Sequence, residues 1–570
     1  MDFNKNLEEL RKKIGEIGAD AILVAMNNFF GNFEDKLSGI GYISGFTGSN
    51  GRAIVSQNKA MLAVDGRYTK QAFEQTDNDF WEIKNYPEYD TNTLIAGIIS
   101  HGQTLAIGMA SITYKSYLSI LSLSNKLGFK IKLLDEFPLF KPQKSAKTIY
   151  LMNEKDQGES RRNKAERIKN TLSIGESLLI SDSSMIGWAF GVRIAPTEDK
   201  CVLPNCVAFI PKAGKPILFS DLELKDQCSN FEFKNISEFE SVIKKFEKAP
   251  VIMDFSRTSL YFAEILQRNG FSIKSPKINY GQFEAIKNET EIQNMKIASE
   301  KASLSFIRTL AFAENIRSSS EVEIADFFEN DLKKYDDFVS LSFNSISAFE
   351  RNTALVHYDP KVCGNSKIDS DGLFLFDAGA HFKTATTDMT RTIYRGNNPN
   401  EELKIIYSTV LKSIINFSSM KFPDNLKSCN IDSIARFAIW NQGYDYRFGT
   451  GHGVGNFANV HEHPRVSPMS NDEITKNMVI TVEPGIYRDN FGIRMENMIL
   501  TKQSDKNGFV EFETLNFIPF CRKMIIKEMF SISELAWINN YHKIVFEKFA
   551  DELKTDNLTF NWFKENTREI

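Results

Sequence analysis

The chain has 570 residues, more than one hydrophobic core usually serves, and at roughly 150 residues per domain it predicts three to four domains. Its 69 basic and 73 acidic side chains give a net charge of −4, and no long block of one sign favours a nucleic-acid or membrane partner. No apolar run approaches the ~18 residues that span a bilayer. Six cysteines without a Cys-x-x-Cys pair favour reduced thiols. We therefore expect a soluble cytoplasmic protein.

The first ~140 residues alternate helix-like and strand-like stretches. A helix is predicted over residues 6–18, "NLEELRKKIGEIG", and the predicted strands include 19–26 and 50–56. The segment Phe137–Tyr150 has two prolines, several lysines and no clear periodicity, which indicates a linker. The sequence thus predicts an N-terminal α/β domain over residues 1–142.

A similar order of elements follows the linker. Residues 160–175, "SRRNKAERIKNTLSIG", predict a helix, and strands are predicted over 176–182, 205–211 and 215–221. This order predicts a second α/β domain over residues 143–282, related to the first although the two share little literal sequence.

An amphipathic helix is predicted to open the third domain, which we assign to residues 283–570. Asn288 is a suitable N-cap, and an apolar stripe at helical spacing follows it. The stripe consists of Ile292, Met295, Ala298, Ala302 and Phe306. Such a stripe is typical of core packing rather than of a functional site.

The histidines are concentrated in this third domain. Five of the seven, at positions 357, 381, 452, 461 and 463, fall within about a hundred residues. A single histidine is more often structural than functional, so its neighbours have to decide its role.

Two aspartates lie in a predicted hairpin. In "GLFLFDAGAHFKTATTDMTRTIY", strand-like stretches flank a break at Lys383–Thr386, which places Asp377 and Asp388 on adjacent antiparallel strands. Burying an unpaired, ionised aspartate lowers the stability of the fold by several kcal/mol. A metal ion would compensate for that cost; the alternative is hydrogen bonding by backbone amides and Arg391.

The same arrangement recurs downstream. "NMVITVEPGIY" and "FGIRMENMILTK" indicate two strands joined by a turn, with Glu483 at the end of one and Glu496 inside the other. Glu483 precedes Pro-Gly and could also be a turn residue. Together the two hairpins would present four carboxylates.

A glycine-rich stretch supplies a nitrogen ligand. In "GTGHGVG" the glycines around His452 let the backbone approach a crowded site, and no Gly-Lys-Ser/Thr follows to support a phosphate loop. Four carboxylates and one imidazole suit Mn²⁺, Co²⁺ or Zn²⁺. One divalent ion would leave a charge of about −2, so the ligand set favours two ions, which lower the pKa of water.

These residues resemble the pita-bread metallopeptidases, which include methionine aminopeptidase, prolidase and aminopeptidase P. The resemblance is carried by Asp377, Asp388, His452, Glu483 and Glu496 in "FDAGAHF", "TTDMTRT", "GTGHGVG", "VEPGIY" and "GIRMEN". The length and the segments "SGFTGSNG", "DGRYTKQA" and "ELAWINNYH" are similar to three-domain aminopeptidase P. The resemblance implies an α/β (α+β) fold, in which two related N-terminal α/β domains precede a pita-bread catalytic domain with a C-terminal extension, and a homodimer.

The resemblance also implies roles for the five ligands. Asp377 would bind one ion and His452 with Glu483 the other, while Asp388 and Glu496 would bridge them. Glu483 would take the proton of the water that attacks the substrate.

Other positions match residues that contact substrate in the family. His357 in "ALVHYDP" and His461 in "NVHEHP" match histidines that act on the scissile carbonyl or its oxyanion. Arg67 of "DGRY" matches a substrate-contacting arginine, with a surface salt bridge as the alternative. Arg494 is expected to hydrogen-bond within the ligand shell, and Tyr487 to line the proline side.

Two positions depart from the family pattern. Phe448 replaces the first histidine of His-Gly-Thr-Gly-His-Gly, which would alter an orienting hydrogen bond or a pocket wall near the substrate. His463 stands where the family more often has glycine, and we expect it at the rim or on the surface.

The implied activity is release of the N-terminal residue from peptides with proline second, by attack of a water or hydroxide that bridges two ions. Mn²⁺ is the first expectation, with Co²⁺ or Zn²⁺ as alternatives. A tertiary Xaa-Pro amide lacks an N–H and has restricted geometry, which favours a dedicated pocket. The alternatives are a prolidase restricted to Xaa-Pro dipeptides and a catalytically silent pita-bread module that binds proteins. All five ligands are present, which disfavours the silent module.

Overall fold

The computed structural model describes residues 2–26, 39–135, 147–197 and 200–570. They form two compact units, which are described separately. The first unit comprises residues 1–154, 159–195 and 203–280, and the second comprises 155–158, 196–202 and 281–570. The predicted boundary at 142/143 and most of the predicted linker Phe137–Tyr150 lie outside the described residues. Its last residues belong to a strand, β7 (Thr148–Leu151).

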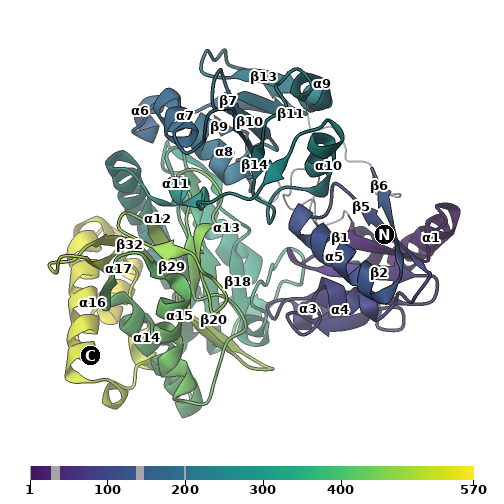
Figure 1. Ribbon diagram of the computed structural model, residues 1–570. Helices are drawn as coiled ribbons and strands as arrows, with labels where there is room; N and C mark the ends of the chain where they lie inside the picture. The colour runs from purple at the N-terminus through teal and green to yellow at the C-terminus, as the bar shows by residue number, and fades with distance from the viewer. Residues whose placement is uncertain (1, 27–38, 136–146, 198–199) are drawn as a thin grey trace. The chain divides into compact units, whose positions relative to one another are not determined.

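The first unit opens with a six-stranded mixed sheet in the order β4-β3-β2-β1-β5-β6 (Figure 1). Its strands are β1 (Ala21–Ala25), β2 (Arg52–Ser56), β3 (Ala60–Val64), β4 (Glu82–Asn85), β5 (Thr104–Gly108) and β6 (Lys130–Leu134). The predicted first helix is α1 (Phe3–Glu16), which Asp2 caps and which buries its apolar face. The predicted elements of this region are confirmed.

A second six-stranded sheet in the same unit repeats this topology, in the order β13-β11-β10-β8-β14-β15. Its strands are β8 (Ser177–Ile180), β10 (Val207–Pro211), β11 (Ile217–Ser220), β13 (Glu232–Asn235), β14 (Val251–Met253) and β15 (Ile273–Lys274). The strand β8 pairs antiparallel with β10 and parallel with β14, as β1 does with β2 and β5. The matching orders and directions confirm two related α/β folds.

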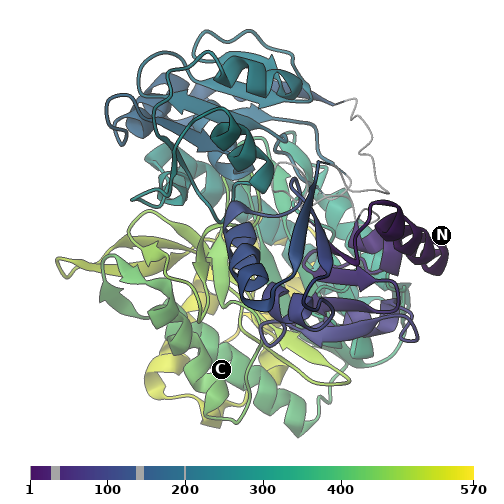
Figure 2. The same cartoon turned by 45° about the vertical axis from the view of Figure 1, so that its right-hand side comes forward.

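Helices flank both sheets (Figures 1 and 2). Those beside the first sheet are α2 (Ile40–Ser44), α3 (Thr69–Gln75), α4 (Thr91–Ala96) and α5 (Tyr114–Leu127). Those beside the second are α7 (Arg161–Lys169), α8 (Ser183–Phe190), α9 (Phe239–Ile243) and α10 (Leu260–Arg268). The predicted helix 160–175 is therefore shorter than expected and ends at Lys169.

The second unit packs long helices around two sheets. The helix α12 (Glu289–Asn315) begins with a capping box between Asn288 and Glu291, and the predicted stripe is buried along it except for the partly buried Ile292. The other long helices are α13 (Glu321–Leu332), α14 (Glu401–Ser418), α15 (Ser428–Trp440), α16 (Ile532–Leu553) and α17 (Asn557–Asn566). None of the helices among the described residues combines the length and hydropathy that crossing a membrane requires.

Two sheets of this unit carry the site. One has the order β18-β20-β23 and the other β24-β33-β32-β29-β26-β27. Their strands are β18 (Ile346–Phe349), β20 (Gly372–Ala378), β23 (Met389–Arg395), β24 (Lys421–Pro423), β26 (Gly451–Gly453), β27 (Glu462–Val466), β29 (Val479–Val482), β32 (Asn497–Gln503) and β33 (Phe509–Thr514). The Glu496 N–H donates to Thr390 O at 3.0 Å, which joins the two sheets next to the predicted ligands.

The C-terminal segment is anchored to these sheets through Arg391. Its buried guanidinium donates to Glu496 O, Ile518 O and the Tyr541 hydroxyl, at 2.7, 2.8 and 2.9 Å. Tyr541 lies on α16 in the segment "ELAWINNYH". Arg391 therefore ties the C-terminal helices (yellow in Figures 1 and 2) to the strands that carry the site.

Candidate metal centre

The first hairpin holds its two aspartates where its ladder ends. Asp377 lies near the end of β20 and pairs across the sheet with Thr390 of β23, whereas Asp388 directly precedes β23. Between them the two chain segments approach closely at Gly379, where a Cβ would lie 1.9 Å from Thr387 O. The adjacent antiparallel strands are confirmed.

The second hairpin is interrupted where its glutamates lie. Glu483 follows β29, and Glu496 falls between β31 (Gly492–Arg494) and β32. The prediction that Glu496 lies inside a strand is wrong, because its N–H donates to Thr390 in the other sheet instead of to its hairpin partner. The break lets both carboxylates leave the ladder.

His452 lies on the short strand β26. Side chains in place of the glycines of this strand would prevent it from pairing with its neighbours. A Cβ on Gly451 would lie 2.0 Å from Thr481 O, and one on Gly453 would lie 1.8 Å from His463 O. The His452 Nδ1 atom is 3.0 Å from Gly453 O. Since a carbonyl only accepts, Nδ1 carries the proton and Nε2 keeps its lone pair for a ligand.

The ligand atoms converge on one buried point. Asp388, His452 and Glu496 each offer an atom within 4.8 Å of the others. The His452 Nε2 atom lies 3.5 Å from Asp388 Oδ2 and 3.5 Å from Glu483 Oε1. These separations exceed a hydrogen bond but suit atoms that share a cation.

A second observation fits a bound cation: one carboxylate oxygen of the cluster lacks a hydrogen bond among the described residues. Asp377 Oδ2 accepts from Arg494 Nη2 at 2.5 Å, whereas the buried Asp377 Oδ1 has no hydrogen-bond partner among the described residues. Arg391 bonds elsewhere, so the alternative in which it satisfies Asp377 is wrong. A buried orphan carboxylate oxygen is expected where a metal ion completes the shell.

Burial and like charge raise the pKa of these carboxyls. The pKa of Asp388 is raised well above its ordinary value by burial and then by the charge of Glu496. Burial and the charge of Glu483 do the same for Glu496. Burial raises the pKa of Asp377 as well, although Arg494 opposes the shift. Without cations, this cluster favours protons on its carboxyls.

The two histidines that are predicted to contact substrate lie near this cluster. The ring of His461 is exposed and its centroid lies 4.2 Å from that of His452. His357 is half-buried and follows Val356, whose carbonyl accepts from Arg494 Nη1 at 3.2 Å. The structure thus brings both histidines into the neighbourhood of the predicted ligands.

Arg494, Tyr487 and Phe448 form a connected group. The Arg494 guanidinium donates to Asp377 and also to the Tyr487 hydroxyl. Burial raises the pKa of Tyr487 to about 12, so its hydroxyl keeps its proton. The Phe448 ring packs edge-on against that of Tyr487, with centroids 5.7 Å apart. This contact supports a wall position for Phe448.

Three predicted residues have other surroundings. Arg67 lies in the first unit, where Nε and Nη2 donate to Asp65 at 3.0 and 2.7 Å; its substrate contact stays a prediction. His463 is half-buried and 3.1 Å from Asp472, so it is not fully exposed on the surface, and its position at the rim stays a prediction. His381 is buried between Thr386 Oγ1 and Lys200 O, so it is structural.

One supporting residue escaped the sequence analysis. Glu321 is fully buried and accepts from Phe349 N, Asn352 Nδ2, Tyr358 Oη and Ser366 N, at 2.6–2.9 Å. It thereby fixes the segment that carries His357. In the sequence it reads as an ordinary first-turn glutamate of α13, and no local signal marks its distant partners.

The fold and this cluster together define a metalloenzyme of the pita-bread type. Residues 293–503 match the metallopeptidase family M24, and residues 508–570 match the C-terminal region of that family. Residues 6–132 and 140–291 each match a creatinase/prolidase N-terminal domain.

Individual relatives agree along the whole chain. A probable Xaa-Pro aminopeptidase P of Phaeosphaeria nodorum is 31% identical over an alignment of 580 positions, which covers 94% of this chain and 88% of that protein. Another, of Ajellomyces capsulatus, is 31% identical over an alignment of 625 positions, which covers 100% of both chains. The crystal structure of X-prolyl aminopeptidase from Caenorhabditis elegans, a cytosolic enzyme with a di-nuclear active site, matches with a TM-score of 0.92, 25% identity and 100% coverage of both chains. The chain therefore belongs to metallopeptidase family M24, in the group of Xaa-Pro aminopeptidase P.

Removing metal should make the stability of the protein depend on pH. Raised carboxyl pKa values mean that the folded metal-free protein binds more protons than the unfolded chain, so its stability should fall as pH rises above about 4 through the raised values. We expect Tm of chelator-treated protein to fall between pH 5 and pH 8, and added metal to raise Tm most at pH 8. Asp388→Asn should flatten this slope in the metal-free protein. Equal gains in Tm from metal at both pH values would contradict the assignment.

Proposed function

We propose that this protein is a metal-dependent aminopeptidase that releases the N-terminal residue from peptides with proline in the second position. The observation that carries this conclusion is the buried convergence of Asp388, His452 and Glu496, with the orphan oxygen of Asp377 beside them, in a chain of this family. The same cluster disfavours a silent binding module, because burying these carboxylates is unfavourable unless cations use them.

We propose two divalent ions, with Mn²⁺ as the first candidate and Co²⁺ or Zn²⁺ as alternatives. Asp377 would hold one ion and His452 with Glu483 the other, with Asp388 and Glu496 between them. The ions, when bound, lower the pKa of water and polarise a carbonyl. Glu483, whose Oε1 lies 3.5 Å from His452 Nε2, would accept the proton that the attacking water loses.

The other residues are assigned to the substrate. His357 and His461 would donate to the scissile carbonyl oxygen as it gains negative charge. Phe448 and Tyr487 would form an apolar wall on the proline side, where the tertiary amide offers no N–H to satisfy. Arg67, whose Nε and Nη2 donate to Asp65, would contact the peptide substrate.

We also propose a cytoplasmic homodimer. On α15, Ile434, Phe437 and Trp440 are 41%, 58% and 47% exposed and form one stripe at helical spacing. The opposite face of the helix, including Ile431 and Ile439, is buried. A second copy packed against the stripe would remove this apolar surface from water.

A direct assay tests the function. Metal-stripped protein should be inactive, and re-supply ion by ion should restore cleavage of a tripeptide with proline second. Asp388→Ala should remain inactive under the same conditions, since it lacks a ligand. Cleavage of Xaa-Pro dipeptides but not of Xaa-Pro-Xaa would establish the prolidase alternative. No cleavage of either substrate by fully loaded protein would favour the binding module.

His461→Ala separates substrate contact from metal binding. We expect kcat to fall about 10²–10³-fold, as when one donor to a developing oxyanion is lost. Elemental analysis should show that both ions are retained. A missing ion in this variant would instead make His461 a ligand.

The homodimer is tested by charge in the α15 stripe. Trp440→Glu should halve the mass measured by sedimentation equilibrium, because a buried carboxylate in the contact is unfavourable. Ile532→Glu is the matched control, since Ile532 is 89% exposed on α16 and outside the stripe. A wild-type monomer, or a variant that stays dimeric, would contradict the proposed interface.

A further inference from the structure

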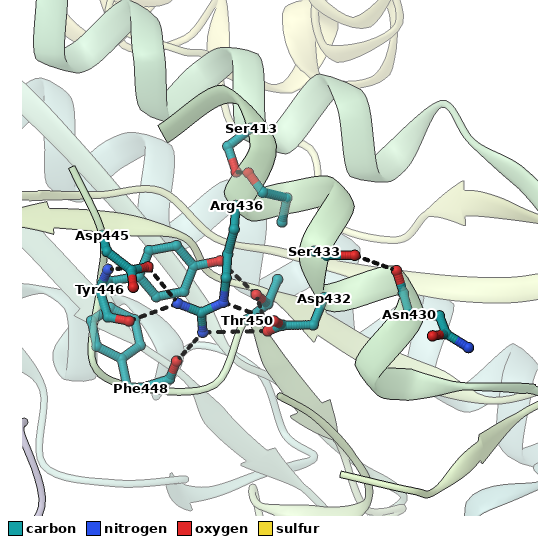
Figure 3. Close-up of polar contacts among 10 residues, drawn as sticks. Ser413, Asn430, Asp432, Ser433, Arg436, Asp445, Tyr446, Phe448 and Thr450 are labelled. Carbon is teal, nitrogen blue, oxygen red and sulfur yellow. Dashed lines mark hydrogen bonds and ion pairs between the residues drawn. The ribbon is translucent and has the colours of Figure 1, made fainter. Parts of the chain in front are cut away.

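Arg436 is a buried guanidinium whose role the sequence does not indicate. It lies on α15 and is 2% exposed, and its Nε donates to Asp432 at 2.7 Å (Figure 3). Its Nη1 and Nη2 donate to the carbonyls of Tyr446 and Phe448, each at 2.6 Å. One side chain thus holds two backbone positions of the 445–450 loop, which joins α15 to β26.

The same network reaches the loop a second time through Asp432. The Thr450 hydroxyl donates to Asp432 Oδ1 at 2.6 Å and lies 2.5 Å from the Tyr446 hydroxyl. The Arg436 guanidinium also covers the Tyr446 ring, 3.9 Å from its centroid. Both ends of the loop are therefore fixed to α15 (Figure 3).

This loop contacts the metal centre at two places. The Glu483 N–H donates to Thr450 O at 2.7 Å, so Thr450 fixes the backbone of a proposed ligand. The Phe448 ring contacts Tyr487, whose hydroxyl is held by Arg494 beside Asp377. A displacement of the loop would therefore move both the wall and a ligand.

We propose that Arg436 is a positioning residue that sets the substrate wall at Phe448 and the backbone of Glu483. This inference rests on the proposed aminopeptidase function. Arg436 donates its hydrogen bonds to Asp432, Asp445, Tyr446 and Phe448 and not to a proposed metal ligand. It acts by holding the loop in one conformation, and a planar guanidinium suits this task because it donates in several fixed directions at once.

Lysine at this position keeps the charge but not the fork. An ammonium can pair with Asp432, but it cannot reach both carbonyls with the same geometry. In Arg436→Lys we expect the loop to relax, KM for a proline-second tripeptide to rise and kcat to fall. Misplacement of catalytic groups by ~1 Å can cost ~10²-fold, so kcat/KM should fall about 10- to 100-fold. Metal content should equal that of the wild type.

Arg395→Lys is the matched control. Arg395 is also a buried arginine of this unit, and it donates to the carbonyls of Ala313 and Ile316 at 2.8 and 2.7 Å. It lies at the opposite end of β23 from Asp388. Its replacement should lower Tm as Arg436→Lys does but leave kcat/KM within about threefold, because it holds no part of the site.

A double-mutant cycle with Phe448→Ala tests the route of the effect. Because part of the influence of Arg436 passes through the Phe448 ring, Arg436→Lys should lower kcat/KM by a smaller factor in the Phe448→Ala background. Thr450→Val, which removes only the hydroxyl bonded to Asp432, takes the place of Arg436→Lys should that variant not fold.

The outcomes are distinguishable. The positioning role would be overturned if the factors by which Arg436→Lys and Phe448→Ala lower kcat/KM simply multiply in the double mutant. It would also be overturned if Arg436→Lys lowers only the stability of the protein, as Arg395→Lys does. Either result would leave the aminopeptidase assignment intact. A wild-type enzyme that cleaves no proline-second peptide with any ion would overturn both.

Discussion

Four carboxylates lie close enough together inside the second unit for the charges of three of them to raise the pKa of the fourth, Asp388, and the rest of the site depends on how their charge is balanced. Arg494 is a cation that the chain itself supplies, and of the four carboxylates it forms its ion pair with Asp377. Burial and mutual repulsion raise the pKa of Asp388 and Glu496, so these groups need protons or metal ions. Two divalent ions balance the cluster better than one, because one ion leaves the set anionic even with Arg494.

This constraint explains why the hairpins are irregular. Regular strands would alternate their side chains across the sheet and would keep Glu483 and Glu496 in the ladder. Instead, the hairpin breaks beside Pro484, and Glu496 bonds through its backbone to Thr390 of the other sheet. The Thr390 hydroxyl then donates to Glu496 Oε2 at 2.8 Å. The hydrogen bonds that the strand ladder loses are thus replaced by hydrogen bonds that orient the carboxylates of the site.

Sequence reasoning predicted the parts of this architecture that are encoded locally. Periodicity located α1, α12 and the strands β1, β2, β8, β10 and β11 of the two α/β sheets, and the resemblance to a known family supplied the ligand order. The residues that support the site were harder to find. The hydrogen-bond partners of Glu321 lie 28–45 residues away in the sequence, and those of Arg436 lie up to 12 residues away. No periodicity in the sequence links either residue to these partners. Glu496 was misplaced because an apolar run does not reveal where a ladder changes partner.

Phe448 shows how a family position can change without disturbing the metal centre. The conformation of its loop is set by bonds to its backbone and to Thr450, and none of these bonds uses the side chain at 448. The ring instead packs between Tyr446 and Tyr487, at centroid distances of 5.0 and 5.7 Å. A residue in this position can therefore exchange a polar group for an apolar one while the backbone of the loop stays in place, so variation at 448 would act on the proposed substrate wall.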